Sequence, residues 1–238
     1  EPEHDLWTNT TQHLIADIEA LREMHGVDRW TILGLSWGTT LAQAYAHAHR
    51  DRVRALVLGL VTTTSRREVE WITEGVGCIF PREWDRFVGF LPESLRHLRS
   101  VDAYATMLAD PDPAVHEPAA LEWCIWEDTH VSLAPGHQPS LRYEDPAFRL
   151  RFARLVTHYW SHAAFLEDDQ LMRDAALLDG IPGVMIHGRF DVSSPLEIPW
   201  RLSKQWTTSR LRILENEGHG GAELPGAVVD ALNELAAG

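Results

Sequence analysis

Apolar positions in the first quarter of the chain follow two different periods. Residues 8–25 open with a Thr-Asn-Thr-Thr cluster, carry apolar residues at four- and three-residue spacing and end before a glycine, which predicts a capped amphipathic helix. Short apolar runs at residues 30–35 and 53–61 predict strands. The second run is nearly continuous, as expected of a parallel strand covered on both faces. The alanine-rich pattern of residues 37–49 predicts a helix between the two strands.

The same alternation returns in the last quarter of the chain. Apolar runs at residues 183–188 and 211–214 predict strands, and helical patterns cover residues 196–205 and 227–235. Strands that alternate with helices predict an α/β fold built on a mostly parallel sheet.

The middle of the chain, residues 62–178, has a different character. Trp, Arg and Glu are dense there, proline recurs, and no strand-like run is present. We interpret this segment as a helical cap inserted into a discontinuous core domain. The predicted core consists of residues 1–61 and 179–238, and the predicted cap of residues 62–178.

Composition narrows the classes of function. A net charge of −14 offers no basic surface for phosphates, which argues against nucleic-acid binding. The 13 histidines are scattered rather than set in a metal-ligand spacing, so we expect no metal and no other cofactor. Cys78 and Cys124 are too few for a disulfide framework, which favours the cytoplasm. No run of about 18 apolar residues is present and the first residues are acidic, so we expect neither membrane binding nor a signal peptide.

A Gly-x-Ser-x-Gly sequence at residues 34–38 joins a predicted strand to a predicted helix. This context predicts a nucleophile elbow, with Ser36 in a strained turn and a glycine on either side to let the strand and the helix pack closely. The backbone N–H of Trp37, at the start of the helix, is the candidate donor to an oxyanion.

A serine hydroxyl is a weak nucleophile unless a base removes its proton, so the chain must also supply a histidine and an orienting carboxylate. Asp191 lies just beyond a predicted strand, and His219 follows the last predicted strand in a glycine-rich turn. In α/β-hydrolase folds the acid follows the nucleophile and the histidine comes last. The order and the element ends together predict a triad of Ser36, Asp191 and His219.

Several stretches resemble the proline iminopeptidase (prolyl aminopeptidase) family of α/β-hydrolase serine peptidases. The Ser-Trp-Gly elbow combined with a His-Gly-Arg-aromatic-Asp stretch is the most specific part of this resemblance. The stretches that carry it are residues 9–11, 17–19, 34–41, 126–127, 158–159, 167–171 and 187–191.

The resemblance implies release of N-terminal proline from peptides by an enzyme with a helical cap and no metal. It also implies that acidic cap residues hold the amino group of the substrate, and Glu127 matches one of them. The position of a second family glutamate corresponds to Val156. Loss of that carboxylate weakens amine recognition, so another small acyl or amide substrate stays open.

The sequence departs from the family pattern before Thr8. Family members carry further strands there and a His-Gly-Gly-Pro-Gly segment that supplies another oxyanion donor. Only four strands are predicted here, and residues 30–35 become an exposed apolar edge. We expect the N-terminal strands to exist as a preceding segment or as a separate chain that completes the sheet.

Three functions remain in view. The first is a serine aminopeptidase that acts on a small peptide through an acyl-enzyme. The second is an esterase, a thioesterase or a biosynthetic amidase with the same triad and an amide or ester substrate. The third is an inactive binding protein built on this fold, which the absent oxyanion segment favours and the intact triad disfavours.

Overall fold

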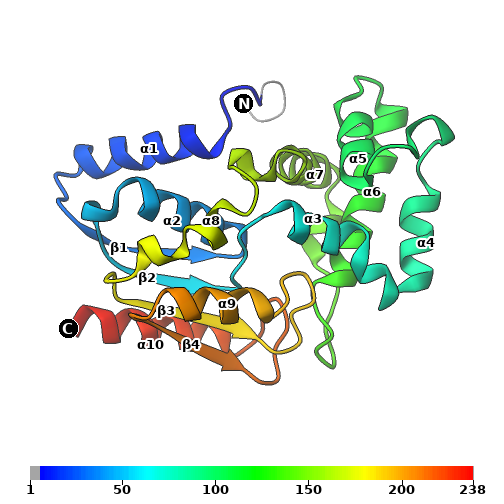
Figure 1. The fold of residues 1–238 in the computed structure, drawn as a ribbon. Helices are drawn as coiled ribbons and strands as arrows, with labels where there is room; N and C mark the ends of the chain where they lie inside the picture. Colours follow the sequence, from blue (N-terminus) through cyan, green and yellow to red (C-terminus); the bar gives the residue numbers. More distant parts are fainter. Residues whose placement is uncertain (1–5, 238) are drawn as a thin grey trace.

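A four-stranded parallel sheet lies at the centre of the computed structural model, which describes residues 6–237 (Figure 1). Its strands follow one another in chain order across the sheet: β1 (Trp30–Leu35), β2 (Val53–Gly59), β3 (Gly183–Gly188) and β4 (Ser209–Leu214). The prediction of an α/β fold with a parallel sheet is confirmed, and all four predicted strands form.

The described residues form ten α-helices. They are α1 (Thr11–Met24), α2 (Trp37–Ala48), α3 (Arg66–Thr73), α4 (Pro81–Gly89), α5 (Ser100–Ala109), α6 (Pro113–His130), α7 (Pro146–Ser161), α8 (Gln170–Arg173), α9 (Glu197–Gln205) and α10 (Leu224–Ala237). The start of α1 matches its predicted cap, because the Thr10 side chain accepts a hydrogen bond from the backbone N–H of His13.

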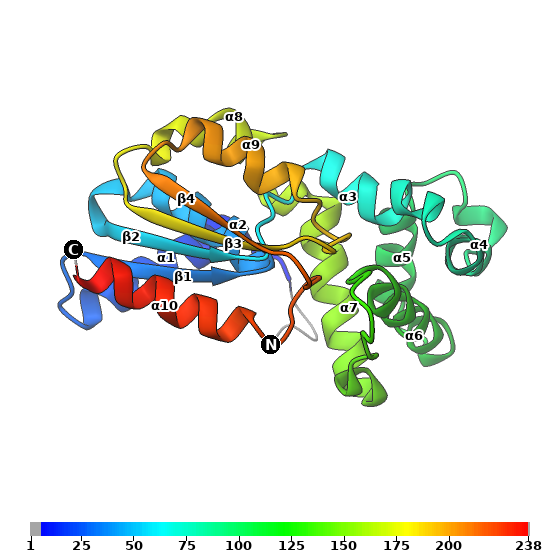
Figure 2. The ribbon, with the colours of Figure 1, turned by 90° about the horizontal axis from the view of Figure 1, so that it is seen from below.

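The sheet is covered on both faces, as Figure 2 shows. On one face, Leu56 and Leu58 of β2 pack with α2, α9 and the segment of residues 170–178. On the other face, Val57 of β2 packs with strand β3 and α10. Alternate residues of β2 thus bury into opposite layers, which explains its nearly continuous apolar sequence.

Helices α3 to α7 gather beyond the carboxyl ends of the strands (Figure 1). They bury a hydrophobic cluster of their own, centred on Phe87, Tyr104, Trp123 and Trp126. Residues 170–178 belong to the predicted cap, yet Met172, Ala175 and Leu178 pack with the sheet. The division into a core of residues 1–61 and 179–238 and a cap of residues 62–178 stays a prediction.

Strand β1 pairs with β2 and lies at one edge of the sheet formed by the described residues. Leu33 and Leu35 on this strand are each 44% exposed.

Cys78 is exposed and Cys124 is buried, and both are free thiols. Within residues 6–237, every helix is too short or too polar to cross a membrane.

Candidate active site

Ser36 occupies a strained turn between β1 and α2. Its φ of 53° and ψ of −128° fall in a region that residues with a side chain rarely adopt. The turn is tied down because the Ser36 N–H donates to the Gly59 carbonyl over 2.9 Å, and the Ser36 carbonyl accepts from the Thr39 N–H over 2.8 Å. Trp37 begins α2, so its N–H is among the free donors at that helix end.

The two glycines of the elbow have different surroundings. A Cβ on Gly34 would lie 2.5 Å from the backbone oxygen of Gly38, so the strand and the helix can approach only because Gly34 lacks one. A Cβ on Gly38 would meet nothing within 4 Å. The expectation that both glycines are needed for close packing is wrong for Gly38. A side chain at Gly38 would meet no atom, and Gly38 takes part in the contact only through its backbone.

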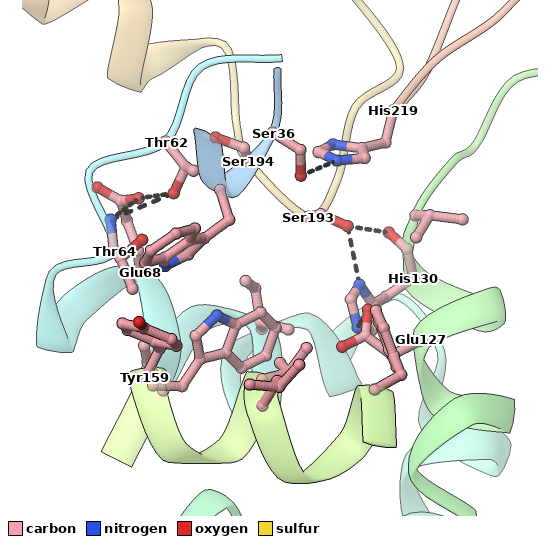
Figure 3. A pocket seen from close by; sticks show the side chains of 18 of the residues that line it. Ser36, Thr62, Thr64, Glu68, Glu127, His130, Tyr159, Ser193, Ser194 and His219 are labelled. Carbon is pink, nitrogen blue, oxygen red and sulfur yellow. Dashed lines mark hydrogen bonds and ion pairs between the residues drawn. The ribbon is translucent and has the colours of Figure 1, made fainter. Parts of the chain in front are cut away.

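Ser36, His219 and Asp191 form a continuous hydrogen-bonded chain. The Ser36 Oγ lies 2.7 Å from Nε2 of His219 (Figure 3). Nδ1 of His219 lies 2.8 Å from Oδ2 of Asp191. The three residues follow β1, β4 and β3, whose carboxyl ends meet at one side of the parallel sheet. The imidazole is therefore placed to take a proton from the hydroxyl while the carboxylate fixes its tautomer.

Burial and neighbouring charges act in opposite directions on the protonation of His219 and Asp191. Burial disfavours the charge on His219, but the charge of Asp191 and their hydrogen bond outweigh it and raise the pKa of His219. Burial likewise disfavours the charge on Asp191, yet His219, His187 and the Ser194 N–H hold the pKa of Asp191 below its usual value. The free protein therefore has an ionised Asp191 carboxylate beside a His219 imidazole of increased basicity.

His187 holds three segments together behind the triad. Its Nδ1 accepts from the Val61 N–H over 3.0 Å, and its Nε2 donates to the Ser194 carbonyl over 2.6 Å. The same Nε2 lies 3.6 Å from Asp191. Since Ser194 also donates its N–H to Asp191 over 2.9 Å, this buried imidazole fixes the loop that carries the carboxylate.

A cavity of about 400 Å³ opens onto Ser36 and His219 (Figure 3). Its walls come from the ends of the strands and from α3, α6 and α7. Two tryptophans, Trp37 and Trp160, line the cavity. Trp126 does not line it, because that ring stacks on Phe87 inside the helical cluster.

Glu127, on α6, lines the cavity and is only 7% exposed. Its Oε1 accepts a hydrogen bond of 3.1 Å from the indole Nε1 of Trp123. Burial raises the pKa of Glu127 to about 7, although the charge of His219 opposes the shift. The carboxylate faces the cavity but ionises only near neutral pH, and its role in binding a substrate amine stays a prediction.

Three other lining residues bear on the charge of the cavity. Val156 lines the cavity from α7 at the position where the family resemblance places a second glutamate. Glu68 also lines it, but its carboxylate is occupied with the Thr62 hydroxyl at 2.5 Å and with the backbone N–H groups of Thr63 and Thr64. Arg142 adds a positive charge near Glu127.

Two of the stretches that carry the family resemblance meet at the rim of the cavity. The Tyr159 hydroxyl donates to the Asn9 side-chain oxygen, and Nε2 of His158 lies 2.8 Å from the Asn9 carbonyl. Tyr159 also contacts Trp37, with ring centroids 4.3 Å apart. Residues far apart in the sequence thus fix the position of α7 next to the elbow.

Two residues that line the cavity are not among those predicted from the sequence. His130 and Ser193 both line it and lie 2.9 Å apart, from Nδ1 to Oγ. A signal was present, because Glu127 and His130 are three residues apart and a helix places such residues on one face. Ser193, by contrast, comes from the loop after β3, and no local pattern predicts its approach to α6.

Comparison with known proteins agrees with the geometry. A family model of the alpha/beta hydrolase fold matches residues 2–223. A probable proline iminopeptidase from Streptomyces coelicolor is 43% identical over 242 residues, which cover all of this chain and 74% of the relative. The chain belongs to the proline iminopeptidase family of α/β hydrolases. The proline iminopeptidase of Xanthomonas citri, another member, is 40% identical over 97% of this chain and 74% of its own length.

Solved structures with much lower sequence identity to this chain share its fold. An alpha/beta fold family hydrolase from Bacillus anthracis superposes with a TM-score of 0.60 at 17% identity, covering 98% of this chain and 74% of that one. A bromoperoxidase from the same species has a TM-score of 0.61 at 14% identity, covering 99% and 77%. The fold of this proline iminopeptidase family member is therefore that of the wider α/β hydrolases.

Proposed function

We propose that this protein is a serine aminopeptidase that releases N-terminal proline from peptides through an acyl-enzyme. The observation that carries the proposal is the hydrogen-bonded chain from Ser36 through His219 to Asp191, which opens into a cavity with a buried carboxylate, Glu127. The names of the curated relatives supply the substrate class.

In the first step, His219 Nε2 takes the Ser36 proton as Oγ attacks the carbonyl carbon of the scissile bond. The Trp37 N–H donates to the oxyanion that forms. His219 then gives the proton to the leaving amine as the C–N bond breaks, and an ester of Ser36 remains. Water, deprotonated by His219, attacks that ester and restores the Ser36 hydroxyl. Asp191 stabilises the imidazolium in both halves.

Glu127 is the proposed partner of the substrate amino group. An ammonium requires a desolvated anion in a cavity of this kind, and Glu127 is the lining carboxylate whose Oε2 receives no hydrogen bond from the described residues. The remaining lining is largely apolar, which suits a pyrrolidine ring.

The test compares prolyl 4-nitroanilide with cyclopentanecarbonyl 4-nitroanilide, in which CH₂ replaces the ring NH. An aminopeptidase prefers the prolyl compound, because only that compound carries the amine. Equal kcat/KM values for the two anilides contradict aminopeptidase action.

Val156 favours a second candidate function: an esterase, a thioesterase or a biosynthetic amidase with the same triad. A wall with one carboxylate instead of two also accepts an uncharged acyl group. This alternative predicts faster turnover of small esters than of prolyl anilides.

The third candidate, an inactive binding protein, is tested by covalent labelling. A serine-directed phosphonate reacts only with an activated hydroxyl, so labelling of Ser36 rejects that function. Absence of labelling in a folded protein supports it.

A further inference from the structure

His130 lies one helical turn after Glu127 on α6 and faces the same cavity (Figure 3). The side chain is 1% exposed, so water has little access to it. Among residues 6–237, its Nε2 atom has no hydrogen-bond partner. A buried polar atom without a partner is rare, and one in the wall of a cavity points to a ligand that satisfies it.

Ser193 determines which ring nitrogen of His130 carries the proton. The Ser193 hydroxyl donates to the backbone carbonyl of His130 over 3.3 Å. Its oxygen is then free to accept from Nδ1 of the same residue, 2.9 Å away. This arrangement assigns the ring proton to Nδ1 and leaves the lone pair of Nε2 directed elsewhere.

The imidazole of His130 is neutral. Burial lowers its pKa to about 3, and the nearby His219 contributes in the same direction. Nε2 is therefore a hydrogen-bond acceptor and has no proton to offer Glu127, whose Oε2 lies 3.6 Å away. An ionised Glu127 has no proton to offer either, so two acceptors stand side by side.

A donor with two N–H groups satisfies both acceptors at once. Hydrogen bonds from nitrogen span about 2.8–3.2 Å, so one nitrogen can reach two atoms that are 3.6 Å apart. The secondary ammonium of an N-terminal proline carries two N–H groups, whereas a primary ammonium carries a third for which the pair offers no acceptor.

We propose that His130 Nε2 and Glu127 Oε2 together bind the two N–H groups of an N-terminal proline, with His130 as the second acceptor of the amine site. This inference rests on the proposed function and extends it by naming a specificity-determining residue. It also gives the cavity two amine acceptors although Val156 supplies none.

The test measures the prolyl preference, defined as kcat/KM for prolyl 4-nitroanilide divided by kcat/KM for cyclopentanecarbonyl 4-nitroanilide. His130→Leu removes the acceptor, and we expect the preference to fall roughly tenfold or more, mainly through a higher KM for the prolyl compound. His130→Gln keeps an acceptor oxygen and recovers part of the loss. His116→Gln changes a histidine on the same helix away from the cavity and keeps the wild-type preference.

Ser193→Ala provides a second route if His130→Leu does not fold. Without the Ser193 oxygen, Nδ1 loses its acceptor and the ring proton can move to Nε2, so the prolyl preference falls although His130 remains. Circular dichroism verifies folding of each variant. A wild-type preference in folded His130→Leu, or in Ser193→Ala where the leucine variant does not fold, overturns the role of His130. A wild-type enzyme with no prolyl preference rejects the proposed function itself.

Discussion

The two walls of the cavity differ in how their polar groups are satisfied. On the wall formed by the strand ends, Ser36, His219 and Asp191 bond to one another, and Asp191 is held further by the loop residue Ser194. On the wall formed by α6, Glu127 has a raised pKa and His130 keeps an unpartnered nitrogen within the described part of the chain.

We infer from this difference that the strand-end wall carries out the reaction and that the α6 wall recognises the substrate. A hydrogen-bonded chain that is complete in the free protein needs no rearrangement when a substrate arrives, which favours catalysis. Buried acceptors that lack donors are satisfied only by a ligand that brings them, which favours selectivity. We therefore expect changes to the strand-end wall to lower turnover of every substrate, and changes to the α6 wall to discriminate among substrates.

The largest expected effect comes from Ser36→Ala. Removal of the proposed nucleophile should lower kcat for the prolyl and the cyclopentyl anilides alike, on the order of 10⁶-fold. Steady-state kinetics measure the loss, and thermal unfolding checks that the fold is kept. Ser94→Ala, at an exposed position on another segment, serves as the matched control. Substantial turnover by a folded Ser36→Ala enzyme contradicts the assignment of the nucleophile.

Asp191→Asn is expected to lower kcat for both anilides by about 10⁴-fold. The amide no longer accepts from Nδ1–H as a carboxylate does, so His219 loses its correct tautomer and the stabilisation of its charged form. Because Asp191 raises the pKa of His219, the acid limb of the kcat/KM profile should also move to lower pH. Asp85→Asn, exposed on α4, controls for the loss of a carboxylate. An acid limb that stays in place argues against this coupling.

Glu127→Gln tests the α6 wall. We expect the prolyl preference to fall roughly 10- to 100-fold, because a charged hydrogen bond to the amine becomes a neutral one. The effect should be concentrated in the prolyl substrate, in contrast to the two variants above. Glu117→Gln, exposed on the same helix, is the control. Equal losses for both anilides would place Glu127 with the catalytic wall and remove the distinction between the walls.

The pH dependence of the prolyl preference is the smallest expected effect. Glu127 has a pKa of about 7, so it is neutral below that pH and ionised above it. The preference should therefore fall roughly fivefold from pH 7 to pH 6, as the ionised fraction decreases. Protonation of His219 slows both substrates and cancels in the ratio. The Glu127→Gln enzyme should show a flat ratio, and a wild-type ratio without pH dependence contradicts the proposed role of the carboxylate.

Much of the fold and of the strand-end wall could be predicted from the sequence. The predicted strands at residues 30–35 and 183–188 have the observed bounds, because a buried parallel strand leaves a nearly uninterrupted apolar run. Ser36, Asp191 and His219 each follow a strand, so chain order and topology place them together.

The α6 wall was harder to predict because its properties depend on packing. Glu127 was found only through the family resemblance, and His130 was not singled out. Its unpartnered nitrogen results from burial and from the approach of Ser193, a residue 63 positions away. The motif spacing also predicted close packing at both Gly34 and Gly38, although only Gly34 needs it. The motif does not show in which direction a Cβ at each position would point.

The left-handed turn at Ser36 restricts which chemistry can be engineered at this position. A β-branched residue is disfavoured at a φ of 53° combined with a ψ of −128°, so we expect a threonine at this position to strain the turn. Cysteine has one γ-atom, as serine does, and fits the same turn. We therefore expect this scaffold to accept a change from an oxygen to a sulfur nucleophile more readily than a change from a primary to a secondary alcohol.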